Sequence, residues 1–177
     1  MNDLVTKIIF SKEDIEKRCK ELGEEISRDY AGKKPLLIGL LKGSVPFLAE
    51  LIKNITIDME VDFINVTSYE GDHSTGKVKI LYDIKQSVEG RDIIFVEDIV
   101  DTGLTLLEII NIFKDRGANS IEIAVLLNKK GARPNDFINP KYVAKDFEGG
   151  FVIGFGLDYN QLYRNLPYVG IINPKYI

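Results

Sequence analysis

The sequence contains little cysteine, little histidine and no tryptophan: one cysteine and one histidine occur in 177 residues. A single cysteine cannot form an internal disulfide, and one histidine with one cysteine excludes the usual zinc clusters. The chain also lacks an apolar run long enough to cross a membrane, and its N-terminus lacks the continuous apolar region of a signal peptide. These absences favour a cytoplasmic protein that needs neither disulfides nor structural zinc.

An excess of positive charge is absent too. Lys and Arg number 23 against 27 for Asp and Glu, which gives a net charge of −4. Such a chain has no overall basic field to attract nucleic acid or an anionic membrane surface. We therefore expect no nucleic-acid partner and no membrane partner, and any site for a polyanion must be local.

The composition, 45% hydrophobic and 28% charged, is typical of a single globular domain, here residues 1–177. Strand-like apolar runs alternate with helix-like apolar stripes from residue 36 to about residue 127, with a hairpin-like excursion at 55–83. This alternation predicts an α/β fold with a mainly parallel central sheet flanked by helices.

We divide this domain into a core at about residues 36–140 and a small lobe, the hood, over the edge of the sheet. The hood is expected mainly from residues 141–177 and the N-terminal segment. Its predicted short strands are Tyr142–Ala144, Phe151–Phe155 and Tyr168–Ile172.

A packing helix is predicted after Ser11, because Ser11-Lys-Glu-Asp14 has the Ser-x-x-acid form of a helix start. Ile15, Cys19 and two later apolar residues then recur at helical spacing. Free cysteines are usually buried, so Cys19 is interpreted as a core residue and not as a nucleophile.

The most informative stretch is Ile93–Leu107. An apolar run of strand length leads into Glu97 and Asp98, and then into the turn Asp101-Thr102-Gly103-Leu104-Thr105 at the start of a helix. Ligands of open parallel sheets lie beyond the carboxyl ends of the strands, where a helix N-terminus attracts anions. The turn has two hydroxyls and a glycine but no lysine, which suits a monophosphate better than a triphosphate.

The two acids suggest what accompanies the phosphate. Glu97 and Asp98 are acceptors when ionised, suited to the hydroxyls of a ribose or to Mg²⁺. Taken alone, the pattern also fits a phosphoacceptor pocket or a solvated loop, and Asp101 could simply cap the helix.

Residues Val96–Leu106 closely resemble the phosphoribosyl pyrophosphate motif of the type I phosphoribosyltransferases. Further segments match the hypoxanthine-guanine phosphoribosyltransferases in order: Leu41-Lys42-Gly43, Ser68-Tyr69, Leu127-Asn128-Lys129, Phe151-Val152 and Leu157-Asp158-Tyr159 leading to Arg164. The chain departs from the family's usual pattern at Asn128, where bacterial relatives usually have aspartate, and at residues 144–145 and 148–150.

The resemblance implies the type I phosphoribosyltransferase fold and a purine-salvage reaction. Members transfer the 5-phosphoribosyl group from phosphoribosyl pyrophosphate to a 6-oxopurine, hypoxanthine or guanine, and release IMP or GMP with pyrophosphate. They use Mg²⁺ and are usually dimers or tetramers. Two alternatives stay open: a transferase that prefers xanthine, and a non-catalytic regulator that senses phosphoribosyl pyrophosphate.

The resemblance also implies roles at the ribose end. Glu97 and Asp98 would bind the ribose hydroxyls and magnesium. The turn of Asp101, Thr102, Gly103, Leu104 and Thr105 would hold the 5′-phosphate, and Asp101 would be the general base facing purine N7.

At the purine end, Lys129 would donate to the 6-oxo group, so that adenine should be a poor substrate. Phe151 would stack on the base, main chain at Val152 and Asp158 would read the 2-position, and Asp158 would reach a second magnesium.

The leaving pyrophosphate would bind Lys42, Gly43 and Arg164, with a cis peptide at Leu41-Lys42. Ser68 and Tyr69 would belong to a lid that excludes water.

Overall fold

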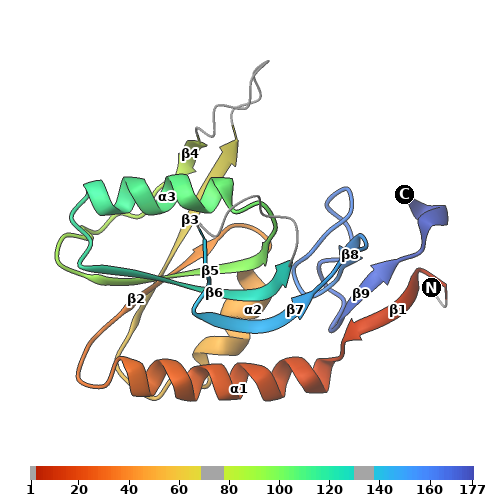
Figure 1. Ribbon diagram of the computed structural model, residues 1–177, viewed down its shortest axis with the longest axis horizontal. Helices are drawn as coiled ribbons and strands as arrows, with labels where there is room; N and C mark the ends of the chain where they lie inside the picture. Colours follow the sequence, from red (N-terminus) through yellow and green to blue (C-terminus); the bar gives the residue numbers. More distant parts are fainter. Residues whose placement is uncertain (1–2, 69–77, 130–137) are drawn as a thin grey trace.

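The computed structural model describes residues 3–68, 78–129 and 138–177. Over these residues the chain forms a six-stranded sheet of order β4-β3-β2-β5-β6-β7 (Figure 1). All neighbouring strands are parallel except β3 and β4, which form an antiparallel pair. The strands are β2 (Leu36–Leu40), β3 (Glu60–Ser68), β4 (Val78–Tyr82), β5 (Asp92–Val100), β6 (Ser120–Lys129) and β7 (Tyr142–Phe147). The predicted fold class is confirmed.

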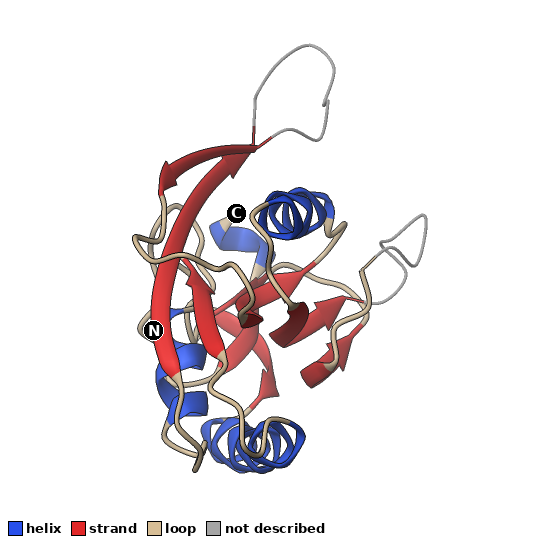
Figure 2. Ribbon diagram, turned by 90° about the vertical axis from the view of Figure 1, so that its left-hand side faces the viewer, coloured by secondary structure: helices blue, strands red, loops and turns tan. Residues whose placement is uncertain are grey.

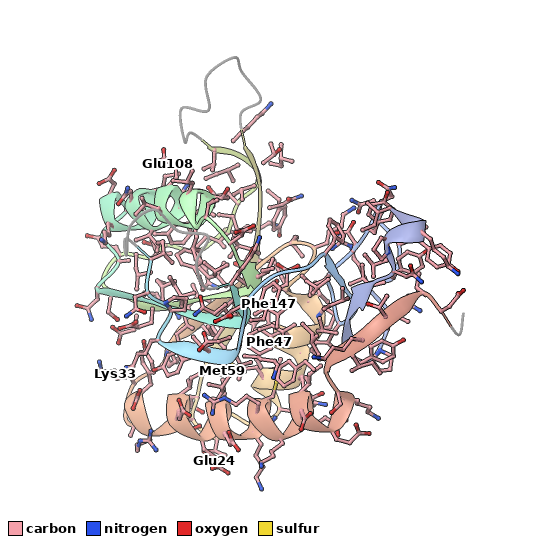
Figure 3. All side chains as sticks on the ribbon, turned by 45° about the vertical axis from the view of Figure 1, so that its right-hand side comes forward. Glu24, Lys33, Phe47, Met59, Glu108 and Phe147 are labelled. Atoms are coloured by element: carbon pink, nitrogen blue, oxygen red, sulfur yellow. The ribbon has the colours of Figure 1, made fainter. Side chains whose placement is uncertain are left out.

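Helices cover both faces of this sheet. Helices α1 (Lys12–Asp29) and α2 (Val45–Ile52) lie on one face and α3 (Leu104–Asp115) on the other (Figures 1 and 2). Successive strand residues point to opposite faces. Leu37 therefore packs with α1 and α2, including the buried Phe47 labelled in Figure 3, whereas Leu36 packs with α3.

Helix α1 begins where the sequence predicts. The Ser11 side chain accepts a hydrogen bond from the Asp14 N–H at 3.1 Å, as expected of an N-cap. Cys19 is fully buried, and burial raises the pKa of its thiol to about 12. Its prediction as a core residue is confirmed.

A second, three-stranded sheet of order β1-β9-β8 forms the hood beside the central sheet. It joins β1 (Val5–Phe10) from the N-terminus to β8 (Val152–Ile153) and β9 (Val169–Ile172), and all of its pairs are antiparallel. The two ends of the described chain also meet here, because the Asn173 N–H donates to the Leu4 carbonyl at 2.8 Å. The expected contribution of the N-terminal segment to the hood is confirmed.

One strand was assigned to the wrong layer. We expected Tyr142–Ala144 in the hood, but β7 pairs in parallel with β6 as the edge of the central sheet. Tyr142 is fully buried, and its hydroxyl donates to Asp29 at the end of α1. Arg18 of α1 also donates to the Val143 carbonyl, so packing on α1 holds this short, partly charged strand in the central sheet.

One strand boundary also differs from the prediction. Strand β3 begins at Glu60 and not near residue 55, and Ile57 and Met59 pack on the core ahead of the strand. Strand β6 ends at Lys129. None of the helices in the described residues is long and apolar enough to cross a membrane.

Candidate active site

The two predicted acids lie inside β5 and not after it, because the strand continues to Val100. Adjacent strand residues point to opposite faces of the sheet, so the carboxylates of Glu97 and Asp98 point away from each other. Glu97 lines a cavity beside α3, whereas Asp98 lines a second cavity toward the hood. One strand therefore supplies an acid to each of two neighbouring cavities.

The cavity beside α3, here called the phosphate cavity, has a volume of about 200 Å³. It is lined by the end of β5, the turn Asp101–Thr105 and the first turn of α3. The N-cap of α3 is Gly103, which has a φ of +76° and no side chain with which to cap the helix. The helix N-terminus, with its positive end of the dipole, therefore opens on this cavity as the sequence predicted for an anion.

The alternative in which Asp101 caps α3 does not fit, because Gly103 takes the N-cap position. Asp101 instead forms an ion pair with Lys129, with 2.9 Å between Oδ2 and Nζ. Lys129 is the last residue of β6, so neighbouring strand ends bring the two side chains together.

The second cavity, here called the purine cavity, has a volume of about 270 Å³. Its lining includes Lys129, Phe151, Val152 and Asp158, the four residues predicted to bind the purine. The ring of Phe151 is 47% exposed, although it precedes an apolar strand. Phe151 contacts the Tyr159 ring edge-on, with 5.5 Å between ring centroids, and so it is available to stack on a flat ligand.

One departure from the family pattern, Gly150, lines the purine cavity beside Phe147 at the end of β7 (Figure 3). Next to Lys129, the Asn128 amide donates to Asp146 of β7 at 2.6 Å. Lys145 lies over the Phe10 ring, 5.2 Å from its centroid. The unusual residues thus connect β6, β7 and the hood around this cavity.

The third part of the site is a corner where the segments that contain Gly43, Asp98 and Gly156 meet in close contact. A Cβ on Gly43 would lie 1.6 Å from Asp98 Oδ2, and one on Gly156 would lie 1.9 Å from the Gly43 carbonyl oxygen. Only glycine fits at such contacts. The Leu41-Lys42 peptide is cis, as the resemblance implied.

Lys42 and Arg164 meet at this corner, as a shared pyrophosphate site requires. Arg164 pairs with Asp158 at 2.7 Å and donates to the Gly156 carbonyl at 2.7 Å. Both cations also donate to the side chain of Gln161. Sequence reasoning missed Gln161 and Gly156, because neither belongs to a recognised motif.

The two acids of β5 lie in buried surroundings that favour a positive partner. Oε2 of Glu97 is buried and has no hydrogen-bond partner among the residues that the structure describes. Burial, and then the charge of Asp98, raise the pKa of Glu97 well above its usual value. Burial also raises the pKa of Asp98, and the Ile99 N–H and Arg164 oppose that rise. Carboxylates in such surroundings suit a cation or the hydroxyl donors of a ligand.

Magnesium fits these residues if the substrate supplies the remaining ligands. Within residues 3–68, 78–129 and 138–177, Glu97, Asp98 and Asp158 do not form one cluster of three metal-binding side chains. Mg²⁺ usually keeps only one or two protein carboxylates and completes its shell with water and phosphate oxygens. Glu97 with Asp98, and Asp158 separately, therefore stay predictions for two magnesium positions.

The predicted lid cannot be placed. Ser68 ends β3, its side chain lies outside the described part of the structure, and so does all of Tyr69.

The fold, with two adjacent cavities at the carboxyl ends of parallel strands, agrees with the class of α/β transferases that the sequence resembles. A model of the phosphoribosyl transferase domain matches residues 5–160. The chain belongs to the phosphoribosyltransferase family.

Individual relatives are similar over nearly their whole length. Proteins named hypoxanthine-guanine phosphoribosyltransferase from Streptococcus thermophilus (strain CNRZ 1066) and Streptococcus agalactiae serotype V are 53% and 52% identical to this chain. Both alignments cover 97% of this chain and 95% of the relative. A crystal structure of a hypoxanthine phosphoribosyltransferase from Staphylococcus aureus is 44% identical, has a TM-score of 0.94, and is matched over 98% of this chain and 94% of that chain.

Proposed function

We propose that this protein transfers the 5-phosphoribosyl group from phosphoribosyl pyrophosphate to hypoxanthine or guanine, in a magnesium-dependent reaction that yields IMP or GMP and pyrophosphate. The observation that carries the proposal is the position of Asp101, which lines both cavities. A ribose anchored through its 5′-phosphate in the phosphate cavity would meet a base in the purine cavity beside this carboxylate. The names of the relatives support the same reaction.

The phosphate cavity would hold the ribose end. Backbone N–H groups of the turn Asp101–Thr105 and the hydroxyls of Thr102 and Thr105 would bind the 5′-phosphate. Glu97 and Asp98 would hold the ribose hydroxyls and magnesium, which supplies positive charge that offsets the charge on the departing pyrophosphate.

The Asp101–Lys129 pair suits the edge of a 6-oxopurine. The 6-oxo oxygen and N7 are neighbours on one edge of the ring, and Lys129 Nζ and Asp101 Oδ2 are likewise neighbours, 2.9 Å apart. Lys129 would donate to the oxygen while Asp101 accepts the proton of N7 as the bond to N9 forms. An amino group at the 6-position cannot accept from Lys129, so adenine should be a poor substrate.

The remaining side chains would orient the base and the leaving group. Phe151 would stack on the purine, and main chain at Val152 and Asp158 would contact its 2-position. Lys42 and Arg164 would hold the pyrophosphate, with Gly43 allowing close approach of the backbone. The carboxylate of Asp158, already bonded to Arg164, would reach a second magnesium.

A spectrophotometric assay with magnesium and phosphoribosyl pyrophosphate tests the proposal, with hypoxanthine, guanine, xanthine or adenine as acceptor. We expect IMP and GMP to form and AMP not to form. Absence of nucleotide from every oxopurine would refute the proposed reaction, and preferential formation of XMP would support the xanthine alternative.

We also propose a cytoplasmic homodimer or homotetramer. The resemblance supports self-association, because members of the family are usually dimers or tetramers. Light scattering after size-exclusion chromatography should give two or four times the mass of 20.0 kDa, whereas a monomer would contradict the proposal.

A further inference from the structure

The turn between Asp158 and Arg164 holds one side chain in an unusual position. Gln161 has a φ of +66°, a left-handed conformation that side chains other than those of Asn and Asp seldom adopt. Its N–H donates to Asp158 Oδ2 at 2.8 Å, and Tyr159 and Leu162 pair through both of their backbone groups. The conformation of Gln161 is therefore fixed by its neighbours.

The side-chain oxygen of Gln161 joins the two candidate pyrophosphate-binding cations. Oε1 accepts from Lys42 Nζ at 3.4 Å and from Arg164 Nη2 at 3.2 Å. Lys42 lies in a loop 119 residues earlier in the chain. One neutral oxygen therefore brings together two positive charges that would otherwise repel each other.

We propose that Gln161 is a positioning residue for pyrophosphate, and this rests on the proposed function of Lys42 and Arg164. Its oxygen lies between the two cations, at the place that an oxygen of the diphosphate would take. The amide gathers the two side chains before the substrate arrives and gives way when the diphosphate binds. Ordering the cations in advance lowers the entropy cost of binding.

The chemistry of the amide suits this role. A carboxylate at the same place would pair with both cations and compete with the diphosphate, whereas an amide oxygen accepts from cations without a net charge. Arg164 is held from two other sides, by Asp158 and by the Gly156 carbonyl. Lys42 has Gln161 as its hydrogen-bond partner, so its position should depend more on the amide.

Two variants test whether the length of the Gln161 side chain matters, apart from any effect on folding of the turn. Gln161→Ala removes the amide. Gln161→Asn tolerates the positive φ and keeps an amide, but its side chain is one methylene shorter. Leu162→Ala is the matched control, because Leu162 is 57% exposed in the same turn and its backbone bonds are kept.

Steady-state kinetics in both directions are the main readout. Both Gln161 variants should raise the KM for phosphoribosyl pyrophosphate, and for pyrophosphate in the reverse reaction, by about 3–10-fold, as expected when a long side chain is ordered only on binding. The KM values for hypoxanthine and IMP, and kcat, should stay within about twofold of wild type, and Leu162→Ala should match wild type.

Equal changes in the KM values for phosphoribosyl pyrophosphate, pyrophosphate, hypoxanthine and IMP would overturn the inference. A fall in kcat alone, or wild-type values in both variants, would overturn it too. Calorimetric titration with magnesium pyrophosphate keeps the test independent of turnover. If the wild type formed no nucleotide, the proposed function would fail. Weaker binding of magnesium pyrophosphate by both variants would still support the role of Gln161, and unchanged binding would refute it.

Discussion

The phosphate cavity and the purine cavity lie side by side but are built in different ways. The phosphate cavity comes almost entirely from one continuous segment, residues 97–106, and offers an anion the backbone of a turn and the start of a helix. The purine cavity collects side chains from β5, β6, β7 and the loops around β8. Binding of the 5′-phosphate should therefore tolerate single side-chain changes in the turn, whereas binding at the purine cavity should depend on individual residues.

The largest effect is expected where the two cavities meet. Asp101→Asn removes the proposed base but keeps the shape of the side chain. We expect kcat to fall by about 10²–10⁴-fold, with the KM for phosphoribosyl pyrophosphate changed much less. The control is Asp115→Asn at the exposed end of α3, which should behave like wild type. Wild-type turnover of the Asp101 variant would refute the general-base role.

Lys129→Met tests the purine cavity alone. Loss of a charged donor to the 6-oxo group should lower kcat/KM for hypoxanthine by about 10–100-fold, while the KM for phosphoribosyl pyrophosphate changes less than threefold. Lys34→Met, which removes an exposed lysine paired with Glu60, is the matched control. Similar losses for both substrates would show that the two cavities are not separable.

Glu97→Gln tests the cost of burying a carboxylate whose Oε2 has no hydrogen-bond partner in the described part of the chain. Burial raises the pKa of Glu97 in the folded protein, so its ionisation reduces stability as pH rises above the usual range of a glutamate. Without ligands, the variant should unfold at a higher temperature than wild type at pH 8, by about 2–4 °C for each kcal/mol gained. The difference should shrink toward pH 5.

Glu97→Gln should also lose the stabilisation that magnesium and phosphoribosyl pyrophosphate give the wild type. Thermal unfolding with and without both ligands at the two pH values measures this. A variant less stable than wild type at pH 8, or one stabilised by the ligands to the same extent, would contradict the assignment.

The smallest effect is expected within the phosphate cavity. Among the described residues, the Thr102 hydroxyl accepts only one long hydrogen bond, of 3.5 Å, from the Leu104 N–H. If backbone groups provide most of the phosphate binding, Thr102→Ala should raise the KM for phosphoribosyl pyrophosphate less than about threefold. A rise of tenfold or more would show that this cavity also depends on individual side chains.

The sequence was informative where the site is continuous. The turn Asp101–Thr105 and the start of α3 follow from local residue types and from a motif of adjacent residues. The assignment of Cys19 to the core follows from helical periodicity in the same way. These features depend on interactions between residues close together in the chain.

Features that depend on distant segments could not be predicted in the same way. The contact between Gly156 and Gly43, and the bridge from Gln161 to Lys42, join parts of the chain more than 100 residues apart. The prediction that placed β7 in the hood was wrong. Packing on α1, and not the strand's own residue pattern, holds it in the central sheet.

The central claim is that the Asp101–Lys129 pair opens to receive one edge of an oxopurine between the two cavities. A crystal structure with IMP and magnesium tests it most directly. We predict that Lys129 Nζ leaves Asp101 and lies within hydrogen-bond distance of the 6-oxo oxygen, with the Asp101 carboxylate beside N7 and the 5′-phosphate at the N-terminus of α3. An intact Asp101–Lys129 pair, with the purine bound elsewhere, would contradict the account.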